Sequence, residues 1–547
     1  MPARVAQAPA IAAPRGEFGA DRQHARDVVP MESIRAVNLP VMIETESPLD
    51  ADLPAEPASM GVRGAAVWAM AGQYLSFGVQ FGASVVISRW FLSPADLGLF
   101  SIAMALALVI AVFQDFGMAR HIAALPTLGR DDLARCASVS LMFALGLATL
   151  IGAVAFPAAR FYHLPGLAPI LLIIAASYLF SPLSVMPLAV MSRTMGFHGH
   201  FMVNLGGALV QGAVAVAMAW QGWGSLSLAW ATLAGAAARA VIAQMMRPTL
   251  PWPLRFDAIA PILGSGSRLS LITVVGALGA RMPDMIVGRF LPLRAVGLFS
   301  RGVGLSDQFR MLIAGAIGQV FFPAFARIRD RGEPLGPAYL RVVAGYTAVL
   351  WPGMAGLALA AQPIVHLLYG PAWTGAAPVL GMVALLEIVL CALPLHLDLP
   401  VLTGQTGRLV VRNVIDTVAS VLLLMAGCRW GLNGAAASRL VYAVVWVLLY
   451  ARLMDEVVRF DRRALLRIYA KSAVATGAAL LPLGLVYALW LSPDAVGLPV
   501  LAVAAGLGGL GWLVALLMTR HPAFDDIQGL AQHLLALPRR VLPKPLR

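Results

Sequence analysis

Long apolar segments of about twenty or more residues follow one another along most of this chain, and short polar stretches separate them. The hydrocarbon core of a bilayer is about 30 Å thick, which roughly 20 helical residues cross. The pattern therefore predicts an all-α polytopic membrane protein with about 14 transmembrane helices. The expected spans are approximately residues 64–90, 96–118, 134–157, 167–191, 199–221, 225–246, 263–290, 296–322, 339–367, 375–402, 409–428, 434–453, 470–490 and 496–518.

Basic residues concentrate in every second loop. Nineteen arginine and lysine residues lie in or beside the loops that follow even-numbered spans, against five in the other loops. Cytoplasmic loops of membrane proteins carry the excess of Lys and Arg, so both chain ends are expected in the cytoplasm. The loops on the opposite side, among them SPAD, QGWG, LYGPAW and LSPD, are too short to hold a catalytic domain.

One loop is repeated. FLSPADLGLFS (Phe91–Ser101) and FLPLRAVGLFS (Phe290–Ser300) share six of eleven residues at an offset of 199. Six spans separate the two copies, so both copies face the same side of the membrane. Parallel repeats of this kind imply two bundles related by an axis along the membrane normal, with a binding cavity where they meet. Chance recurrence of a short turn in a chain rich in Leu and Gly is the alternative.

These patterns predict five segments. A tail (1–60) precedes a first six-helix bundle (61–250), a second bundle (251–455), two additional helices (456–520) and a C-terminal cytoplasmic tail (521–547). Residues 1–60 are rich in Ala and Pro and hold nine of the 27 acidic residues. They lack the basic-then-apolar layout of a signal peptide, so a disordered cytoplasmic tail is expected.

Composition and charge narrow the function. The 547 residues are 59% hydrophobic and 12% charged, with a net charge of +13. The bases stand at the ends of apolar spans, as membrane topology requires, so nucleic acid is not expected as a partner. Three cysteines and the histidines His366 and His396 stand apart in the sequence. No catalytic residue, metal or cofactor is therefore expected.

Polar residues inside the spans follow helical spacing and lie in the spans that flank the repeat. A charge inside hydrocarbon is costly, so such residues face a cavity or a partner. Arg281 and Asp284 stand three apart in the seventh span, where a self-neutralising packing pair is the alternative. The other candidates are Gln80 and Ser84 in the first span, Gln114 and Asp115 in the second, Arg301 and Gln308 in the eighth, and Arg89 and Arg289 at span ends. Glu387, Asp398, Asp416 and Arg439 are candidates for ion coupling or, in the alternative, for helix packing.

Several of these stretches resemble a known family. RWFLSPADLGLF, FQDFGMAR, RMPDMIVGRFLPLRAVGLFSR, GQVFFPAFARIRD and LLYGPAWTGAAPVL, within residues 62–455, resemble Wzx-type flippases of the multidrug/oligosaccharidyl-lipid/polysaccharide transporter superfamily. The resemblance implies a V-shaped pair of six-helix bundles around a cationic cavity, in the bacterial inner membrane. It also implies translocation of an undecaprenyl-diphosphate-linked oligosaccharide to the periplasmic leaflet for lipopolysaccharide or exopolysaccharide synthesis. Asp284 falls on the family's recurring acidic residue of the seventh span.

Arginine offers planar, bidentate donors to phosphate. We therefore expect Arg281, Arg289 and Arg301, together with Arg89, to bind the diphosphate or acidic sugars, and the serines and glutamines of the first span to bind the glycan. The alternatives are another exporter of the same superfamily, for drugs or lipids, and an integral-membrane polysaccharide polymerase. The expected partners are the lipid-linked oligosaccharide, membrane lipid, and a polysaccharide polymerase or export machinery.

Overall fold

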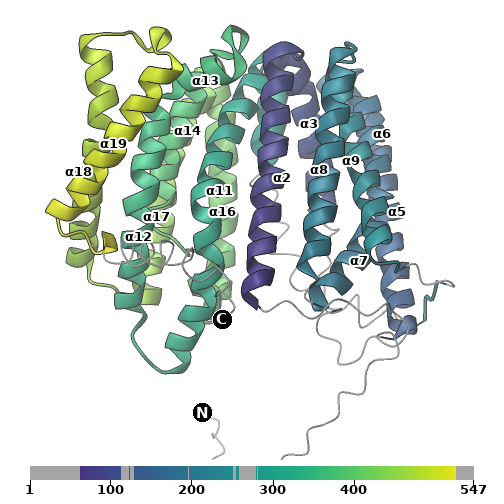
Figure 1. Cartoon of the computed structure of the whole chain (residues 1–547), viewed down its shortest axis with the longest axis horizontal. Coiled ribbons are helices and arrows are strands. Elements are labelled where there is room, and N and C mark those ends of the chain that lie inside the picture. Colours follow the sequence, from purple (N-terminus) through teal and green to yellow (C-terminus); the bar gives the residue numbers. More distant parts are fainter. Residues whose placement is uncertain are drawn as a thin grey trace, which may run out of the picture. The chain divides into compact units, whose positions relative to one another are not determined.

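The computed structural model describes residues 62–112, 122, 129–194, 196–249, 254–257, 279 and 281–524 (Figure 1). These residues are helical apart from turns and loops, and they contain no β-strand. The helices are α2 (Val62–Trp90), α3 (Pro94–Ala111), α5 (Arg130–Tyr162), α6 (Leu167–Tyr178), α7 (Ser181–Arg193), α8 (Phe197–Trp220), α9 (Ser225–Met246), α11 (Leu293–Asp330), α12 (Leu335–Leu359), α13 (Ala361–Tyr369), α14 (Ala376–Leu390), α15 (Asp398–Leu402), α16 (Thr406–Cys428), α17 (Gly431–Val458), α18 (Arg462–Leu489) and α19 (Leu498–Met518). Short 3-10 helices lie at Pro371–Trp373 and Pro493–Ala495.

Ten of the described helical segments are long and apolar enough to cross a membrane. The predicted spans that do not meet this criterion correspond to α2, α11, α14 and the helical residues 281–290. Helix α11 contains several charged residues, and α14 has only 15 residues. The prediction of an all-α, multi-pass membrane protein is confirmed, and the number fourteen stays a prediction.

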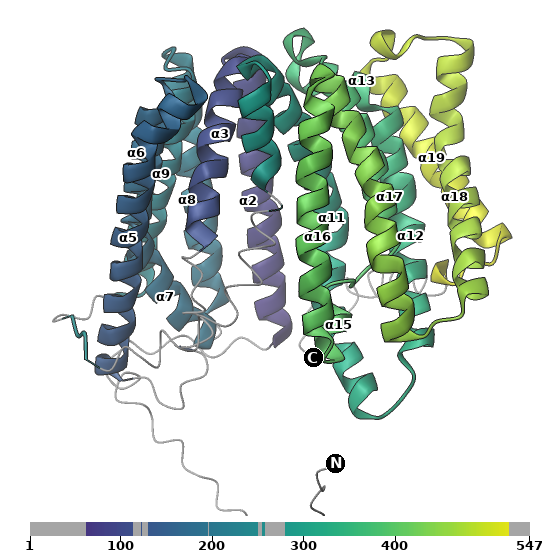
Figure 2. The same cartoon turned by 180° about the vertical axis from the view of Figure 1, so that it is seen from behind.

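The first group of helices runs from α2 to α9 and the second from α11 to α17 (Figures 1 and 2). In the first group α8 packs against both α2 and α9, and α6 packs against α5 and α9. In the second, α14 contacts α11, α12 and α17, and α16 packs on α17. The final pair, α18 and α19, is attached through α12. The boundaries of the five predicted segments stay a prediction.

Three of the predicted spans are broken. The span expected at 167–191 divides into α6 and α7, and that at 339–367 divides into α12 and α13 at Ala360. The prediction of one helix through residues 375–402 is wrong, because α14 ends at Leu390 and α15 begins only at Asp398. Pro394 lacks an amide donor and clashes with a preceding turn, and Leu395 adopts a φ of 58°, so no helix continues there.

Helix α11 extends beyond the predicted span at both ends. Its 38 residues are about 57 Å long at 1.5 Å per residue, nearly twice the thickness of the hydrocarbon core. Its C-terminal turns carry Arg327 and Arg329, which match the basic side of the membrane. Helix α11 is therefore longer than one crossing of the hydrocarbon core requires.

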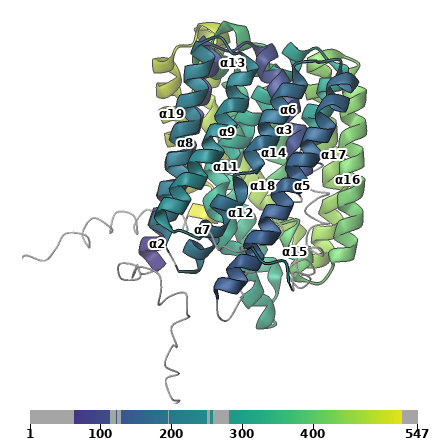
Figure 3. The same ribbon diagram turned by 90° about the vertical axis from the view of Figure 1, so that its right-hand side faces the viewer.

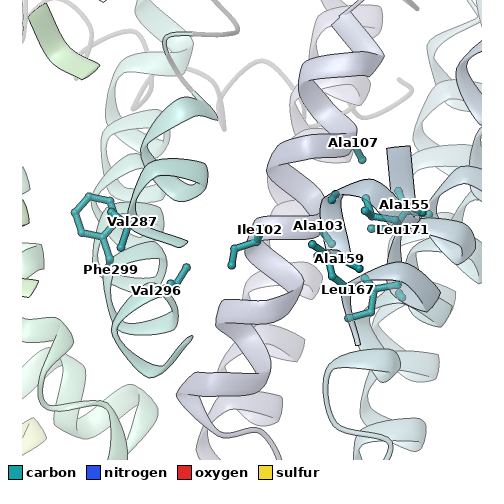
Figure 4. Close-up of a cluster of buried hydrophobic side chains, with 14 of the residues drawn as sticks. Ile102, Ala103, Ala107, Ala155, Ala159, Leu167, Leu171, Val287, Val296 and Phe299 are labelled. Carbon is teal, nitrogen blue, oxygen red and sulfur yellow. The ribbon is translucent and has the colours of Figure 1, made fainter. Parts of the chain in front are cut away.

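Helices α3 and α11 join the two groups, and the repeated loop forms the start of each helix. Ser93 caps α3: its hydroxyl accepts a hydrogen bond from the Asp96 amide, and the Asp96 carboxylate accepts one from the Ser93 amide, both at 3.2 Å. Farther along, Ile102 points from α3 toward Val296, while Ala103 and Ala107 face the apolar side chains of α5 and α6 (Figure 4). Helix α3 is thus packed on both sides, and its face toward α11 forms the junction between the groups.

Candidate functional site

A half-buried arginine lies where α11 meets α2. The guanidinium of Arg301 donates hydrogen bonds to the hydroxyls of Ser84, at 2.6 Å, and Ser88. These serines are four residues apart and so lie one above the other on one face of α2. Arg301 thereby connects a helix of the first group to a helix of the second.

Two aromatic rings cover the same guanidinium. The Cζ atom of Arg301 lies 4.8 Å from the ring centroid of Tyr369 and 5.3 Å from that of Trp373. The LYGPAW turn brings these rings together, because Gly370 adopts a φ of 86° that ends α13 and reverses the chain. The indole nitrogen of Trp373 donates to the carbonyl oxygen of Ser88 at 2.8 Å, which holds the turn against α2. Arg301 is therefore fixed from three elements.

The charge of Arg301 has no acidic partner among the described residues. Within the described part of the chain, no carboxylate forms a salt bridge or a hydrogen bond with its guanidinium. Its buried Nε atom has no hydrogen-bond partner among the same residues. Aromatic faces and hydroxyls stabilise a guanidinium only in part. A partly desolvated cation without a counter-charge is destabilising and attracts an anion.

Arg301 faces a cavity of about 270 Å³. Its polar lining residues come from four helices of both groups: Gln80 and Ser84 of α2, Gln211 of α8, Thr232 of α9, and Arg301 and Gln308 of α11. The remaining lining residues are apolar, and none of those described is acidic. The cavity thus presents one cation and neutral hydrogen-bonding groups in otherwise apolar surroundings.

Four of the predicted site residues, Gln80, Ser84, Arg301 and Gln308, share this cavity. The others lie elsewhere or outside the described residues. Arg89 donates to the carbonyl oxygen of Leu367, and the Arg289 guanidinium lies 5.2 Å from the ring centroid of Phe161; neither lines the cavity. Gln114 and Asp115 lie outside the described residues.

Asp284 and Arg281, in the helical residues 281–290, lie at a different polar group that includes residues of α11 and α17. Asp284 interacts electrostatically with Arg281, Asp307 and Arg439. Nearby, Arg310 contacts Glu387 at 3.2 Å and Asp307 at 3.4 Å, while Arg439 donates to Ser420 at 2.9 Å. Unlike the Arg301 cavity, this cluster pairs its cations with acids. The described residues hold no group of three or more His, Cys, Asp or Glu side chains with metal-binding geometry.

Sequence reasoning missed Gln211, Thr232, Tyr369 and Trp373. Asn204 and Gln211 stand seven residues apart on α8, so they share one face of an apolar helix and could have been noticed. Thr232 stands at the same spacing from Arg239 on α9, whereas the LYGPAW turn carries no such signal. Their role depends on which helices become neighbours, and periodicity does not predict that.

Two helical groups joined around a cationic cavity define a multi-pass membrane transporter. Residues 86–378, more than half of the chain, match the family model described as "Polysaccharide biosynthesis protein". The chain therefore belongs to the polysaccharide biosynthesis protein family, in agreement with the resemblance of its motifs.

Two relatives show the extent of the similarity. The succinoglycan biosynthesis transport protein ExoT of Rhizobium meliloti (strain 1021) is 24% identical over 400 residues, which cover 70% of this chain and 76% of that protein. The lipopolysaccharide biosynthesis protein WzxC of Escherichia coli (strain K12) is 20% identical over 335 residues, covering 59% of this chain and 66% of WzxC. The match therefore spans about two thirds to three quarters of these relatives.

Solved structures support the fold. The lipid II flippase MurJ, in an inward closed conformation, has a TM-score of 0.67 at 14% identity, with 83% of this chain and 99% of MurJ covered. A multidrug-resistance transporter of the MATE family, in an inward-facing conformation, has a TM-score of 0.52 at 16% identity, with 71% of this chain and 98% of that chain covered. At these identities the similarity shows the fold alone.

Proposed function

We propose that this chain is a flippase that moves an undecaprenyl-diphosphate-linked oligosaccharide from the cytoplasmic to the periplasmic leaflet of the bacterial inner membrane, with both chain ends in the cytoplasm. The oligosaccharide is a repeat unit for lipopolysaccharide or exopolysaccharide synthesis. The observation that carries the proposal is the half-buried guanidinium of Arg301, which has no described acidic partner and faces a cavity between the two helical groups. Association with a polymerase or export machinery stays a prediction.

The chemistry of this substrate suits the cavity. A prenyl tail is stable in hydrocarbon, whereas a diphosphate and sugar hydroxyls lose water at high cost unless the protein replaces those interactions. Arg301 supplies charged donors for phosphate oxygens. Gln80 and Gln308 each offer an amide oxygen and an NH₂ group to hydroxyls. The protein thus provides a polar path through the membrane for the headgroup alone.

The position of Arg301 suits alternating access. The cavity lies between helices of both groups, so a relative movement of the groups would expose it to one side or the other. A ligand shifts such an equilibrium only by the difference between its affinities for the two states. An anion at Arg301 would compete with the hydroxyls of Ser84 and Ser88 and so act on the contact between α2 and α11.

The two alternatives need other chemistry. An exporter of cationic drugs requires acidic groups in its cavity, and the described lining residues include none. A polymerase requires catalytic acids, bases or a metal in contact with the sugar, and the cavity lining offers a single arginine among neutral side chains. Neither alternative uses an unpaired guanidinium.

The test replaces Arg301 in a strain that lacks the chromosomal copy. We expect Arg301→Gln to lower polysaccharide export by about tenfold or more, because charged hydrogen bonds contribute about 1.5–3 kcal/mol. Lipid-linked oligosaccharide should accumulate in the cytoplasmic leaflet. Arg294→Gln is the matched control, since Arg294 lies on the same helix, is exposed and does not line the cavity. Full export by Arg301→Gln at normal protein levels would contradict the proposal.

A further inference from the structure

A second polar cavity adjoins the Arg301 cavity within the first group of helices. It has a volume of about 470 Å³ and is lined by residues of α2, α8 and α9, including Trp68, Gln73, Asn204 and Arg239. Gln80 lines both cavities. From Gln73 to Ser84 the axis of α2 rises by about 16 Å, so the two cavities succeed one another along this helix.

Arg239 is the only charged side chain among the described lining residues of this second cavity. Helices α2, α8 and α9 contain no Asp or Glu. Arg239 donates a hydrogen bond to the neutral Gln211, whose Oε1 atom lies 3.5 Å from its Nη1 atom. The half-buried guanidinium therefore has no counter-charge within the described part of the chain.

Small residues hold Arg239 and Gln211 in place. A Cβ atom at Gly207 would collide with the Arg239 stem, and one at Gly235 would stand 2.8 Å from Cβ of Gln211. Gly207 and Gly235 thus provide the space in which these side chains lie. The arrangement is specific, because larger residues at either position would displace Arg239 or Gln211.

A second observation also points to an absent ligand. Ser76 lines the cavity, is only 7% exposed, and its hydroxyl has no hydrogen-bond partner among the described residues. A buried hydroxyl without a partner is destabilising, because it loses its hydrogen bonds to water without replacement. A polar ligand in the cavity would supply the missing hydrogen bond.

The remaining walls combine aromatic rings with amides. The rings of Trp68 and Phe201 meet edge to face, with centroids 5.1 Å apart. Gln73, Gln80 and Asn204 each present one acceptor and two donor hydrogens. A sugar has an apolar C–H face and a rim of hydroxyls, which match aromatic rings and amides respectively. An arginine among them adds a site for a carboxylate.

We propose that this second cavity is a glycan subsite that selects oligosaccharides carrying a carboxylate, with Arg239 pairing with that group. The proposal rests on the proposed function and makes it more specific: the diphosphate occupies Arg301 while an acidic sugar, or a carboxylate-bearing substituent on a sugar, reaches Arg239. Arg239 binds the carboxylate through charge-assisted hydrogen bonds, and the amides and rings bind the sugar to which it is attached. Substrate selection thus depends on the first helical group, and headgroup binding on its junction with the second.

The test measures binding to the purified full-length protein in lipid nanodiscs. The probes are a glucuronate-containing disaccharide, its neutral glucose counterpart, and farnesyl diphosphate. We expect the acidic disaccharide to bind about tenfold more tightly than the neutral one, since a charged hydrogen bond contributes about 1.5–3 kcal/mol. Arg239→Gln should abolish this preference and leave farnesyl diphosphate affinity unchanged, which also shows that the variant is folded. Arg239→Lys should retain part of the preference.

Three results would overturn the subsite: equal binding of both disaccharides to the natural protein, a preference that survives Arg239→Gln, or an equal loss of farnesyl diphosphate binding in that variant. The last result would place Arg239 in the diphosphate site. Failure of the proposed function has a different signature. In that case Arg301→Gln would leave farnesyl diphosphate binding unchanged, while the disaccharide comparison still decides the role of Arg239.

Discussion

The hydroxyl of Ser101 donates a hydrogen bond of 2.9 Å to the hydroxyl of Ser300, and these two residues occupy the same position in the two copies of the repeated loop. The surrounding contacts are reciprocal. A Cβ atom at Gly98 would collide with the carbonyl oxygen of Leu293, and one at Gly297 with that of Pro94, again at matching positions of the two copies. The repeat therefore forms a two-fold junction between α3 and α11.

Because this junction is tightly packed, we expect a single added methyl group to lower stability strongly. We expect Gly297→Ala to destabilise the protein by about 1–3 kcal/mol, because the new Cβ would overlap a backbone carbonyl that cannot move aside. Gly304→Ala is the control on the same helix, where no heavy atom lies within 4 Å of the new Cβ. There the change should be neutral or stabilise by up to about 1 kcal/mol. Thermal unfolding in detergent measures both, and equal melting temperatures would contradict the tight junction.

We expect the hydrogen bond between Trp373 and Ser88 to help hold Arg301 in position. Trp373→Phe removes the hydrogen bond to the Ser88 carbonyl and keeps an aromatic ring beside Arg301. We expect a loss of about 1 kcal/mol in stability and a several-fold weaker affinity for farnesyl diphosphate. Trp512→Phe is the matched control, because Trp512 donates similarly to Ala348 at 2.7 Å, far along the chain from the cavity residues. Equal farnesyl diphosphate affinities of Trp373→Phe and Trp512→Phe would argue against a role of Trp373 in positioning Arg301.

Because Arg310 contacts Glu387, we expect substitutions at these two positions to have non-additive effects on stability. Glu387 is only 6% exposed, and its Oε2 atom lies 3.2 Å from Nε of Arg310. Removing one partner of a buried pair costs about 3–5 kcal/mol, whereas replacing both by apolar residues is often neutral. Arg310→Met leaves the buried Glu387 carboxylate without its guanidinium, so it should lower the melting temperature more than the double variant Arg310→Met with Glu387→Leu. The exposed pair of Arg331 and Glu333, at 3.9 Å, is the control and should change stability by less than about 1 kcal/mol when broken.

We expect the stability of the protein to depend on pH through His521, which follows α19. Its Nδ1 atom accepts a hydrogen bond from the Ala523 amide at 3.2 Å, so Nε2 carries the proton and donates to the Ser472 hydroxyl at 3.0 Å. Burial, and to a lesser extent the charge of Lys471, lower the pKa of His521 from 6.5 to about 4. The unfolded chain therefore takes up a proton first as the pH falls.

It follows that this contribution to stability is complete above pH 6.5 and is lost progressively between pH 6.5 and about 4. The melting temperature should fall over that range in the natural protein and fall less steeply in His521→Gln. His366→Gln, at an exposed position, serves as the control. If the melting temperatures of the natural protein and His521→Gln changed identically with pH, His521 would not be the source of the pH dependence.

Hydropathy predicted most helices because the bilayer imposes one length and one polarity on every span, and α9 has the expected bounds. The break between α14 and α15 could not be predicted from Pro394, because prolines also occur in helices that are kinked but continuous. Within the site, helical spacing identified Gln80, Ser84, Arg301 and Gln308. It could not exclude Arg89 or Arg289, since spacing shows which residues share a face but not what that face meets.

The same reason explains why Arg239 and Trp373 escaped prediction. Arg239 is an isolated charge in α9 with no polar residue three or four positions away, and its environment comes from α8. Trp373 belongs to a turn whose contact with Ser88 joins residues 285 positions apart. The views in Figures 1 and 3 show α2, α8 and α9 as neighbours, an arrangement that only tertiary structure supplies.

Leaflet translocation in proteoliposomes tests the central claim most directly. The purified protein is reconstituted with a fluorescent undecaprenyl-diphosphate-linked oligosaccharide, and the fraction that reaches the opposite leaflet is followed in time. We expect rapid translocation by the natural protein and by Arg294→Gln, and a rate lower by about tenfold or more with Arg301→Gln. An unchanged rate with Arg301→Gln, or no translocation by the natural protein, would contradict the account.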